Sequence, residues 1–167
     1  KTMTNVSTVN GNLTMSGTAA ATTAINTAIG GNLSVGDGTS FTAAGYNLTV
    51  TGTTTVGDGT RGTLTISSAT GTKTFTGLVT VNAGGTWNNS GNEAITMRGG
   101  LTNGGTFTAG TGVYTMDTNA QTITCNATTT IPSLTATTIT VTHNCSETYP
   151  LIVSTALSGT GTIKAGT

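Results

Sequence analysis

A short pattern of one apolar residue, one Thr or Ser and a second apolar residue returns every fifteen or sixteen residues in the middle of the chain. Its second apolar residue falls at Val35, Val50, Ile66, Val81 and Met97. A fixed short period indicates a chain that stacks similar units along one axis, because each unit buries its apolar residues only under a neighbour. The five positions are therefore the predicted core of the repeat, and we expect each strand to pair in parallel with the strand one period later.

The apolar residues alternate with Thr inside each unit. Leu48 and Val50 share one face of a predicted strand, while Thr49 and Thr51 take the other. Asp-Gly and Gly-Gly pairs between these runs supply the positive φ values that tight turns need. A second set of inward positions is expected six residues after the first, at Phe41, Val56, Thr72, Trp87 and Asn103.

The composition favours a β structure and excludes several classes of partner. The 167 residues include 46 Thr and 25 Gly, and only 6% are charged. Thr is β-branched and suits a pleated surface. A net charge of zero leaves no basic face for nucleic acid. No apolar run reaches the 18 or so residues of a membrane span, so we expect no membrane-spanning segment.

These features predict an all-β fold: a single-stranded parallel β-helix, or β-solenoid, with an irregular C-terminal cap. One domain is expected over residues 1–167, with regular repeats over about 31–116 and an irregular part over about 117–167. Pro132 and Pro150 are expected at strand ends or edges, since Pro lacks the ladder donor. The alternative is an antiparallel, pilin-like β-sandwich, because a unit of this length also fits one hairpin.

Two cysteines, Cys125 and Cys145, lie in the irregular part. An even pair in a Thr-rich chain of low charge favours a disulfide formed outside the cell. The alternative is a pair of buried thiols, because free Cys is often a core residue.

Candidate chemical groups are few. Asp37 and Asp58 occupy matching Gly-Asp-Gly turns, where aligned carboxylates bind Ca²⁺ in some repeat proteins, but the nonapeptide of calcium β-rolls is missing and a turn role is favoured. His143 shares a predicted strand face with Cys145, and it lacks the further ligands that a metal site needs. Trp87 is expected to fill the core rather than to bind sugar rings. We therefore expect no catalytic residue, no metal site and no cofactor.

Seven Asn-x-Ser/Thr sequences are candidate glycosylation sites. Because Asn, Ser and Thr are abundant, most of these matches are expected by chance. They begin at Asn5, Asn12, Asn32, Asn47, Asn88, Asn126 and Asn144.

Four segments resemble the Gly/Thr-rich strand repeats of secreted bacterial surface proteins, namely the β-solenoid regions of autotransporter and filamentous-haemagglutinin-like adhesins. The segments are NLTVTG at 47–52, VTVNAGGTW at 79–87, LTNGGTF at 101–107 and STALSGTGT at 154–162. The resemblance implies a parallel β-helix, secretion and a role in a surface fibre or in adhesion. It carries over no catalytic residue.

The sequence thus predicts a non-enzymatic structural subunit of an extracellular filament or cell-surface fibre. Its expected partners are copies of itself, joined by end-to-end stacking or by strand donation through residues 1–10 or 151–167. The alternative is a β-helix adhesin module that binds or cleaves carbohydrate, with surface glycans as partners.

Overall fold

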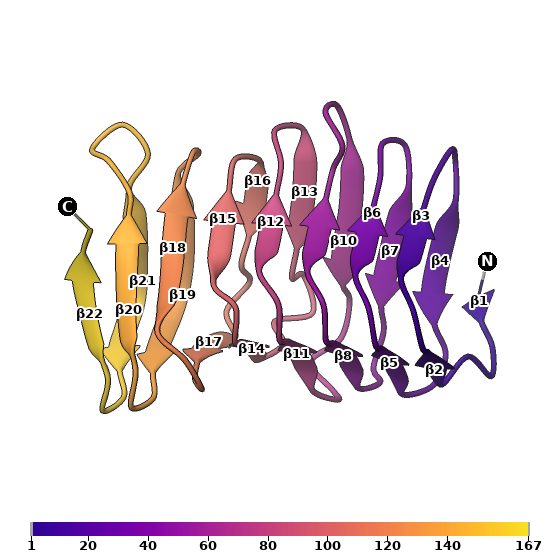
Figure 1. Ribbon diagram of the computed structural model, residues 1–167, viewed down its shortest axis with the longest axis horizontal. Coiled ribbons are helices and arrows are strands. Elements are labelled where there is room, and N and C mark those ends of the chain that lie inside the picture. Colours follow the sequence, from indigo (N-terminus) through magenta and orange to yellow (C-terminus); the bar gives the residue numbers. More distant parts are fainter. Residues whose placement is uncertain (1, 167) are drawn as a thin grey trace.

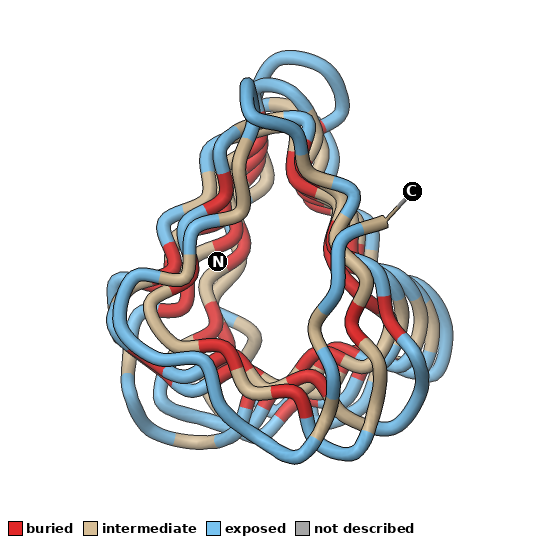
Figure 2. Tube along the Cα trace, turned by 90° about the vertical axis from the view of Figure 1, so that its left-hand side faces the viewer, coloured by how far each residue is buried: buried red, intermediate tan, exposed pale blue. Residues whose placement is uncertain are grey.

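The computed structural model describes residues 2–166, whose regular structure is all β-strand. The backbone winds into a β-solenoid whose successive turns, called coils below, lie side by side along one axis (Figure 1). Most coils contribute one strand to each of three sheets, so the view along the axis is triangular (Figure 2). All strand pairs between neighbouring coils are parallel, which confirms the predicted solenoid rather than the antiparallel sandwich.

The structure has three parallel sheets, of which sheets B and C run the length of the described chain and sheet A ends at Thr108. Sheet A contains β1 (Thr2–Met3), β4 (Ala20–Thr23), β7 (Ser40–Ala43), β10 (Gly62–Ile66), β13 (Gly85–Asn88) and β16 (Thr106–Thr108). Sheet B contains β2 (Thr8–Val9), β5 (Thr27–Ile29), β8 (Leu48–Val50), β11 (Lys73–Phe75), β14 (Ile95–Met97), β17 (Val113–Met116), β19 (Thr129–Ala136) and β21 (Leu151–Ser158). Sheet C contains β3 (Leu13–Met15), β6 (Leu33–Val35), β9 (Thr54–Val56), β12 (Val79–Val81), β15 (Leu101–Asn103), β18 (Gln121–Cys125), β20 (Thr140–Asn144) and β22 (Thr162–Ala165).

A coil is longer than the sequence period. Val35 in β6 pairs with Val56 in β9, and Val56 pairs with Val81 in β12. The expected pairing of Val35 with Val50 is therefore wrong, because Val50 lies in a different sheet. The repeated pattern falls on every second strand of a three-strand coil, so one period covers about two thirds of a coil.

The five predicted core positions are nevertheless buried. Their exposed fractions are 0% for Val35, Val50, Ile66 and Met97 and 1% for Val81. Their side chains point inward whichever sheet they occupy, since the alternation within each strand is the same. The sequence pattern therefore identifies the facing of these residues correctly and their strand partners incorrectly.

The second predicted inward set is buried at four of its five positions. Phe41, Val56, Trp87 and Asn103 are fully buried. Thr72 is exposed, and Lys73 occupies the inward position instead. The prediction failed here because one extra residue in the turn between β10 and β11 moves the inward position from six to seven residues after Ile66.

Thr forms ladders along the outside of the sheets. In sheet B, residues at equivalent outward positions lie in register from coil to coil: Thr49, Thr74, Thr96, Thr115 and Thr135. Stiff β-branched side chains stacked in this way favour the extended backbone on both neighbours. This explains how a chain with so few charges forms a regular sheet surface.

Asn side chains join the coils at the turns. The Asn12 Oδ1 atom accepts the backbone N–H of Asn32, and the Asn32 Oδ1 atom accepts that of Thr53, at 2.8 and 2.9 Å. A second series at another turn links Asn26 to Asn47 and Asn47 to Thr72, each at 2.9 Å. These bonds satisfy backbone donors in the turns, where the sheet ladders have ended.

The C-terminal part departs from the three-sheet pattern. Sheet A ends at β16, whereas sheets B and C continue through β19, β20, β21 and β22. Pro132 lies inside β19, where the register with β21 shifts between Ile131 and Ser133. Its expected position at a strand end or edge is wrong, because β19 pairs on both sides and a bulge also accommodates a residue without an N–H donor. Pro150 lies directly before β21.

Candidate functional site

The core is open at the C-terminal end of the described solenoid. Leu157 in β21 lies in register with the fully buried Leu134 in β19, yet it is 59% exposed. Ile163 in β22 lies in register with the fully buried Val141 and is only half-buried. The apolar columns of the core therefore continue into the last coil, where no further described coil covers them.

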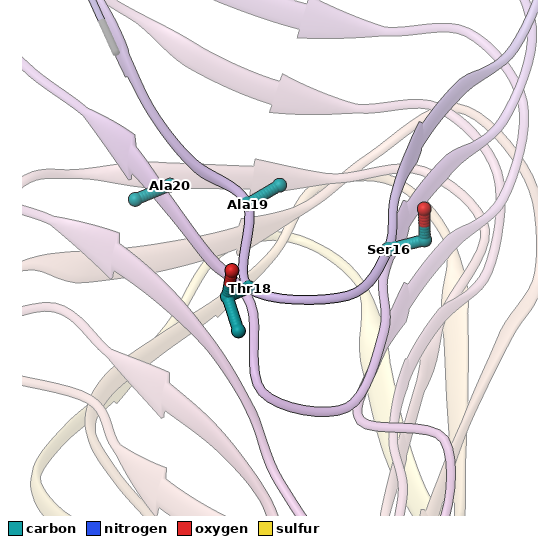
Figure 3. A pocket seen from close by; sticks show the side chains of 4 residues that line it. All are labelled: Ser16, Thr18, Ala19 and Ala20. Atoms are coloured by element: carbon teal, nitrogen blue, oxygen red, sulfur yellow. The ribbon is translucent and has the colours of Figure 1, made fainter.

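The N-terminal end is open in the same way. Met3, Val9 and Leu13 are half-buried side chains that pack against the core from the first coil. A pocket lies at the corner between β3 and β4 (Figure 3). Ser16, Thr18, Ala19 and Ala20 line it. None of these four residues has an ionisable side chain, so the pocket presents methyl and hydroxyl groups and no acid or base.

The same corner already receives one stacked coil. The N–H of Gly36 donates to the carbonyl of Met15 at 3.1 Å, and the N–H of Ser40 donates to the carbonyl of Ala19 at 3.0 Å. The stacking contacts at the N-terminal corner are thus made by backbone groups. Parallel coils stack through such groups with little dependence on side-chain identity.

The two cysteines form the predicted disulfide. Cys125 ends β18 and Cys145 directly follows β20, and the neighbouring residues Thr124 and Asn144 lie in register. The bond therefore joins two successive coils of sheet C near the C-terminal end. This position suits a link that holds the last coils to the rest of the solenoid.

Asp37 organises the turn of the coil that stacks on it. Its carboxylate accepts the backbone N–H groups of Asp58, Thr60 and Arg61, with Oδ1 distances of 3.0, 3.1 and 3.0 Å. These bonds, from Arg61 first, lower the pKa of Asp37 from 3.8 to about 2. Gly38 and Gly59 have φ values of 73° and 123°, as Asp-Gly turns require. The favoured turn role agrees with this geometry.

Acid is expected to weaken this turn. Since the pKa of Asp37 is lower in the folded chain than in the unfolded chain, its contribution to stability is present above about pH 4 and is lost as the pH falls through about 2. We expect the melting temperature of the wild type to fall more steeply over this range than that of Asp37→Asn. Asp58→Asn is the matched control, because the three backbone donors bind Asp37 and not Asp58. Equal acid dependence of all three proteins, followed by circular dichroism, would contradict this role.

The other acidic residues and the histidine form no metal centre. Asp117 pairs with Arg98, with 2.9 Å between Oδ1 and Nε, on a partly exposed surface. Glu147 is exposed in the turn after β20. His143 lies in register with Ile123 and is half-buried. No group of three or more His, Cys, Asp or Glu residues that could hold a metal ion occurs within residues 2–166.

The candidate glycosylation sites lie on the surface. Asn88 is half-buried, and the remaining six are exposed: Asn5, Asn12, Asn32, Asn47, Asn126 and Asn144. Three of them, at positions 12, 32 and 47, use Oδ1 in the ladders between coils. Accessibility permits modification at these residues, and whether they carry sugar stays a prediction.

Most aromatic residues fill the core. Trp87 is fully buried, stacks on Phe107 with 5.7 Å between ring centroids, and meets Phe75 edge-on at 5.1 Å. The exposed aromatic residues among the described ones are Tyr46 and Tyr149, which lie in turns of distant coils. They form no row that could bind a chain of sugar rings.

A buried polar cluster that the sequence did not predict lies beside this aromatic group. It consists of Lys73, Asn89, Glu93 and Tyr114, all less than a tenth exposed. Asn89 Nδ2 donates to the carbonyl of Glu93 at 2.8 Å, and Asn89 Oδ1 accepts the Glu93 N–H at 3.0 Å. Burial raises the pKa of Tyr114 and lowers the pKa of Lys73.

Lys73 and Glu93 form an ion pair inside the solenoid. Lys73 Nζ lies 3.5 Å from Glu93 Oε2, with side chains 0% and 9% exposed. The sequence held a signal for the burial of Lys73, though not for its pairing with Glu93. In Lys73-Thr74-Phe75, strict alternation places Lys73 on the same face as Phe75, which is a core position.

Comparisons with known proteins add no relative. No protein-family model, no curated protein and no solved structure matches the chain. No helix among the described residues is long and apolar enough to cross a membrane.

Proposed function

We propose that the chain is a non-catalytic structural subunit of an extracellular fibre that grows when copies stack end to end. The open core at both ends carries this proposal. Exposed apolar residues such as Leu157 continue buried columns, so a second copy placed on the axis would cover them as a further coil does.

Backbone groups support the same mode of assembly. The terminal strands of each sheet, such as β3 and β22 in sheet C, pair on one side only within residues 2–166. Unpaired edges add further strands readily. Strand donation is less well supported, because β1, β2, β21 and β22, within the segments expected to donate, already pair inside the chain.

The disulfide and the composition support an extracellular location for this role. Disulfides persist in oxidising environments. A chain with 6% charged residues has little repulsion between copies, which favours association over remaining a monomer.

Charging the C-terminal end is expected to block assembly. We expect the purified wild type to form concentration-dependent oligomers in light scattering after size exclusion, and Leu157→Lys and Ile163→Lys to stay monomeric. A lysine at either position would have to lose its hydration under the next copy. Leu78→Lys is the matched control, because Leu78 is 38% exposed in the turn between β11 and β12, on the side of the rod.

Comparing these variants shows whether copies associate through the ends of the rod or through its sides. Loss of oligomers in the two end variants, with oligomers kept in Leu78→Lys, supports end-to-end stacking. A wild type that stays monomeric at every concentration, or oligomers that survive both end variants, would overturn the proposal.

A further inference from the structure

The ion pair of Lys73 and Glu93 places a primary amine beside a carboxylate in the interior of the solenoid. Lys73 lies in β11, between Leu48 of the preceding coil and Ile95 of the following coil. Glu93 lies two residues before β14, in that following coil. The Nζ and Oε2 atoms are 3.5 Å apart in the interior. The pair therefore spans two stacked coils, as Cys125 and Cys145 do nearer the C-terminal end.

The two oxygens of Glu93 have different surroundings. Oε1 accepts the N–H of Ala94 at 3.0 Å, whereas Oε2 is buried without a hydrogen-bond partner. Lys73 Nζ donates instead to the carbonyl of Thr70, at 3.0 Å. Taking two charges out of water costs several kcal/mol per ion, so a stabilising buried ion pair needs hydrogen bonds to its charged atoms. Here the lysine and the facing oxygen do not make a good hydrogen bond with each other.

We propose that Lys73 and Glu93 condense into an amide, so that an isopeptide bond between Nζ and Cδ links two neighbouring coils. This inference does not depend on fibre formation, and it assigns a covalent modification to two buried residues that the proposed assembly does not use.

The atoms and electrons of the step balance. One proton passes from the Nζ ammonium to Oε2, which gives a neutral amine and a neutral acid. The nitrogen lone pair attacks Cδ, the nitrogen releases a second proton, and the bond between Cδ and Oε2 breaks. Oε2 leaves with both protons as water. No oxidant, reductant or external acid takes part.

Each neighbouring group has a place in this step. The Ala94 N–H holds Oε1, on which negative charge develops when the nitrogen attacks. The two bonds between Asn89 and Glu93 fix the backbone from which the carboxyl group projects. Burial lowers the pKa of Lys73 and so favours the neutral amine that attacks. Holding the amine beside the carboxyl group in one site raises its effective concentration there.

The product also relieves an unfavourable state. A neutral amide replaces two buried charges, and its oxygen keeps the bond from Ala94. The exposed pair of Arg98 and Asp117 is closer, at 2.9 Å, yet no condensation is expected there. A guanidinium stays protonated and is no nucleophile, and water solvates both groups.

Mass spectrometry of the purified chain tests the proposal directly. The intact mass of the folded wild type is expected to be lower than the sequence mass by one water, in addition to the two hydrogens lost in the disulfide. Trypsin does not cleave after an acylated lysine. We therefore expect one peptide covering 62–98, lighter by one water, in place of separate peptides 62–73 and 74–98.

Lys73→Arg is the control variant. It keeps the positive charge beside Glu93 but provides no nucleophile, so it should show no loss of water and full cleavage after position 73. The Asp-Gly turns at Asp37 and Asp58 could also lose one water. Such a loss would map outside residues 62–98, so it is not mistaken for the link between Lys73 and Glu93.

The wild-type result decides the proposal whether or not the variant folds. A linked 62–98 peptide, complete or partial, supports the isopeptide bond. Full mass with cleavage after Lys73, a loss of water that maps elsewhere, or the same loss in Lys73→Arg would overturn it.

Discussion

Replacing Trp87 by Ala is expected to lower the free energy of unfolding by about 3–5 kcal/mol, which is the usual cost of truncating a buried aromatic residue. Trp87 is fully buried and contacts the rings of Phe75 and Phe107 in neighbouring coils. Its Nε1 also donates to the Tyr114 hydroxyl at 3.1 Å. Removing the indole leaves a cavity across several coils and removes a donor from the buried polar cluster.

Urea denaturation followed by circular dichroism measures this effect. Thr86→Ala is the matched control, because Thr86 is the preceding residue in β13 and faces outward. Its substitution should change the free energy of unfolding by no more than about 0.5 kcal/mol. A loss below about 1 kcal/mol in Trp87→Ala would mean that this aromatic group does not hold the coils together.

Removing the disulfide is expected to cost about 3 kcal/mol, because the link closes a loop that the unfolded chain would otherwise explore freely. The double variant Cys125→Ser with Cys145→Ser avoids a lone reactive thiol. We expect its urea midpoint to fall and to match that of the reduced wild type. The midpoint of the double variant itself should not respond to a reductant.

The effect of the disulfide should also be local. Cys125 and Cys145 join β18 to the segment after β20, so hydrogen exchange should accelerate first in β20, β21 and β22. Unchanged midpoints after reduction, or uniform acceleration along the whole chain, would contradict the role of this bond in holding the last coils.

Sequence alone was sufficient to predict the strands and their faces and to favour a solenoid, while the antiparallel sandwich stayed open as the alternative until the parallel pairing was seen. Segments such as Leu48-Thr49-Val50 alternate so regularly that the inward and outward faces follow directly. Gly and Asp-Gly turns between them leave no room for a helix. The facing of a strand is a local property, and local properties can be predicted from a short run of residues.

The strand partners could not be predicted in the same way. Val35 and Val50 have the same pattern, but Val35 pairs with Val56, whose own segment begins with two threonines. Strands of all three sheets share the same sequence pattern, so the pattern does not show which strands belong to one sheet. The sequence period follows every second strand instead. Pairing depends on coil length, which the turns set, and those turns vary.

The buried polar cluster was missed for a related reason. The expected inward residue before Phe75 was Thr72, and one extra turn residue moves that position to Lys73. Glu93 belongs to a turn, where a carboxylate is expected in solvent. Only the stacking of two coils brings Lys73 Nζ within 3.5 Å of Glu93 Oε2, so no local sequence pattern predicts the pair.

The axial repeat of the assembled fibre tests the central claim most directly. Sheets B and C each contain eight strands in the described chain. At about 4.8 Å between strands, each copy should therefore advance the fibre by roughly 38 Å, with strands perpendicular to the fibre axis. Electron cryomicroscopy of the purified protein should show this repeat. Filaments whose strands run along the axis, or the absence of any filament, would contradict a molecule that other copies extend from its open ends.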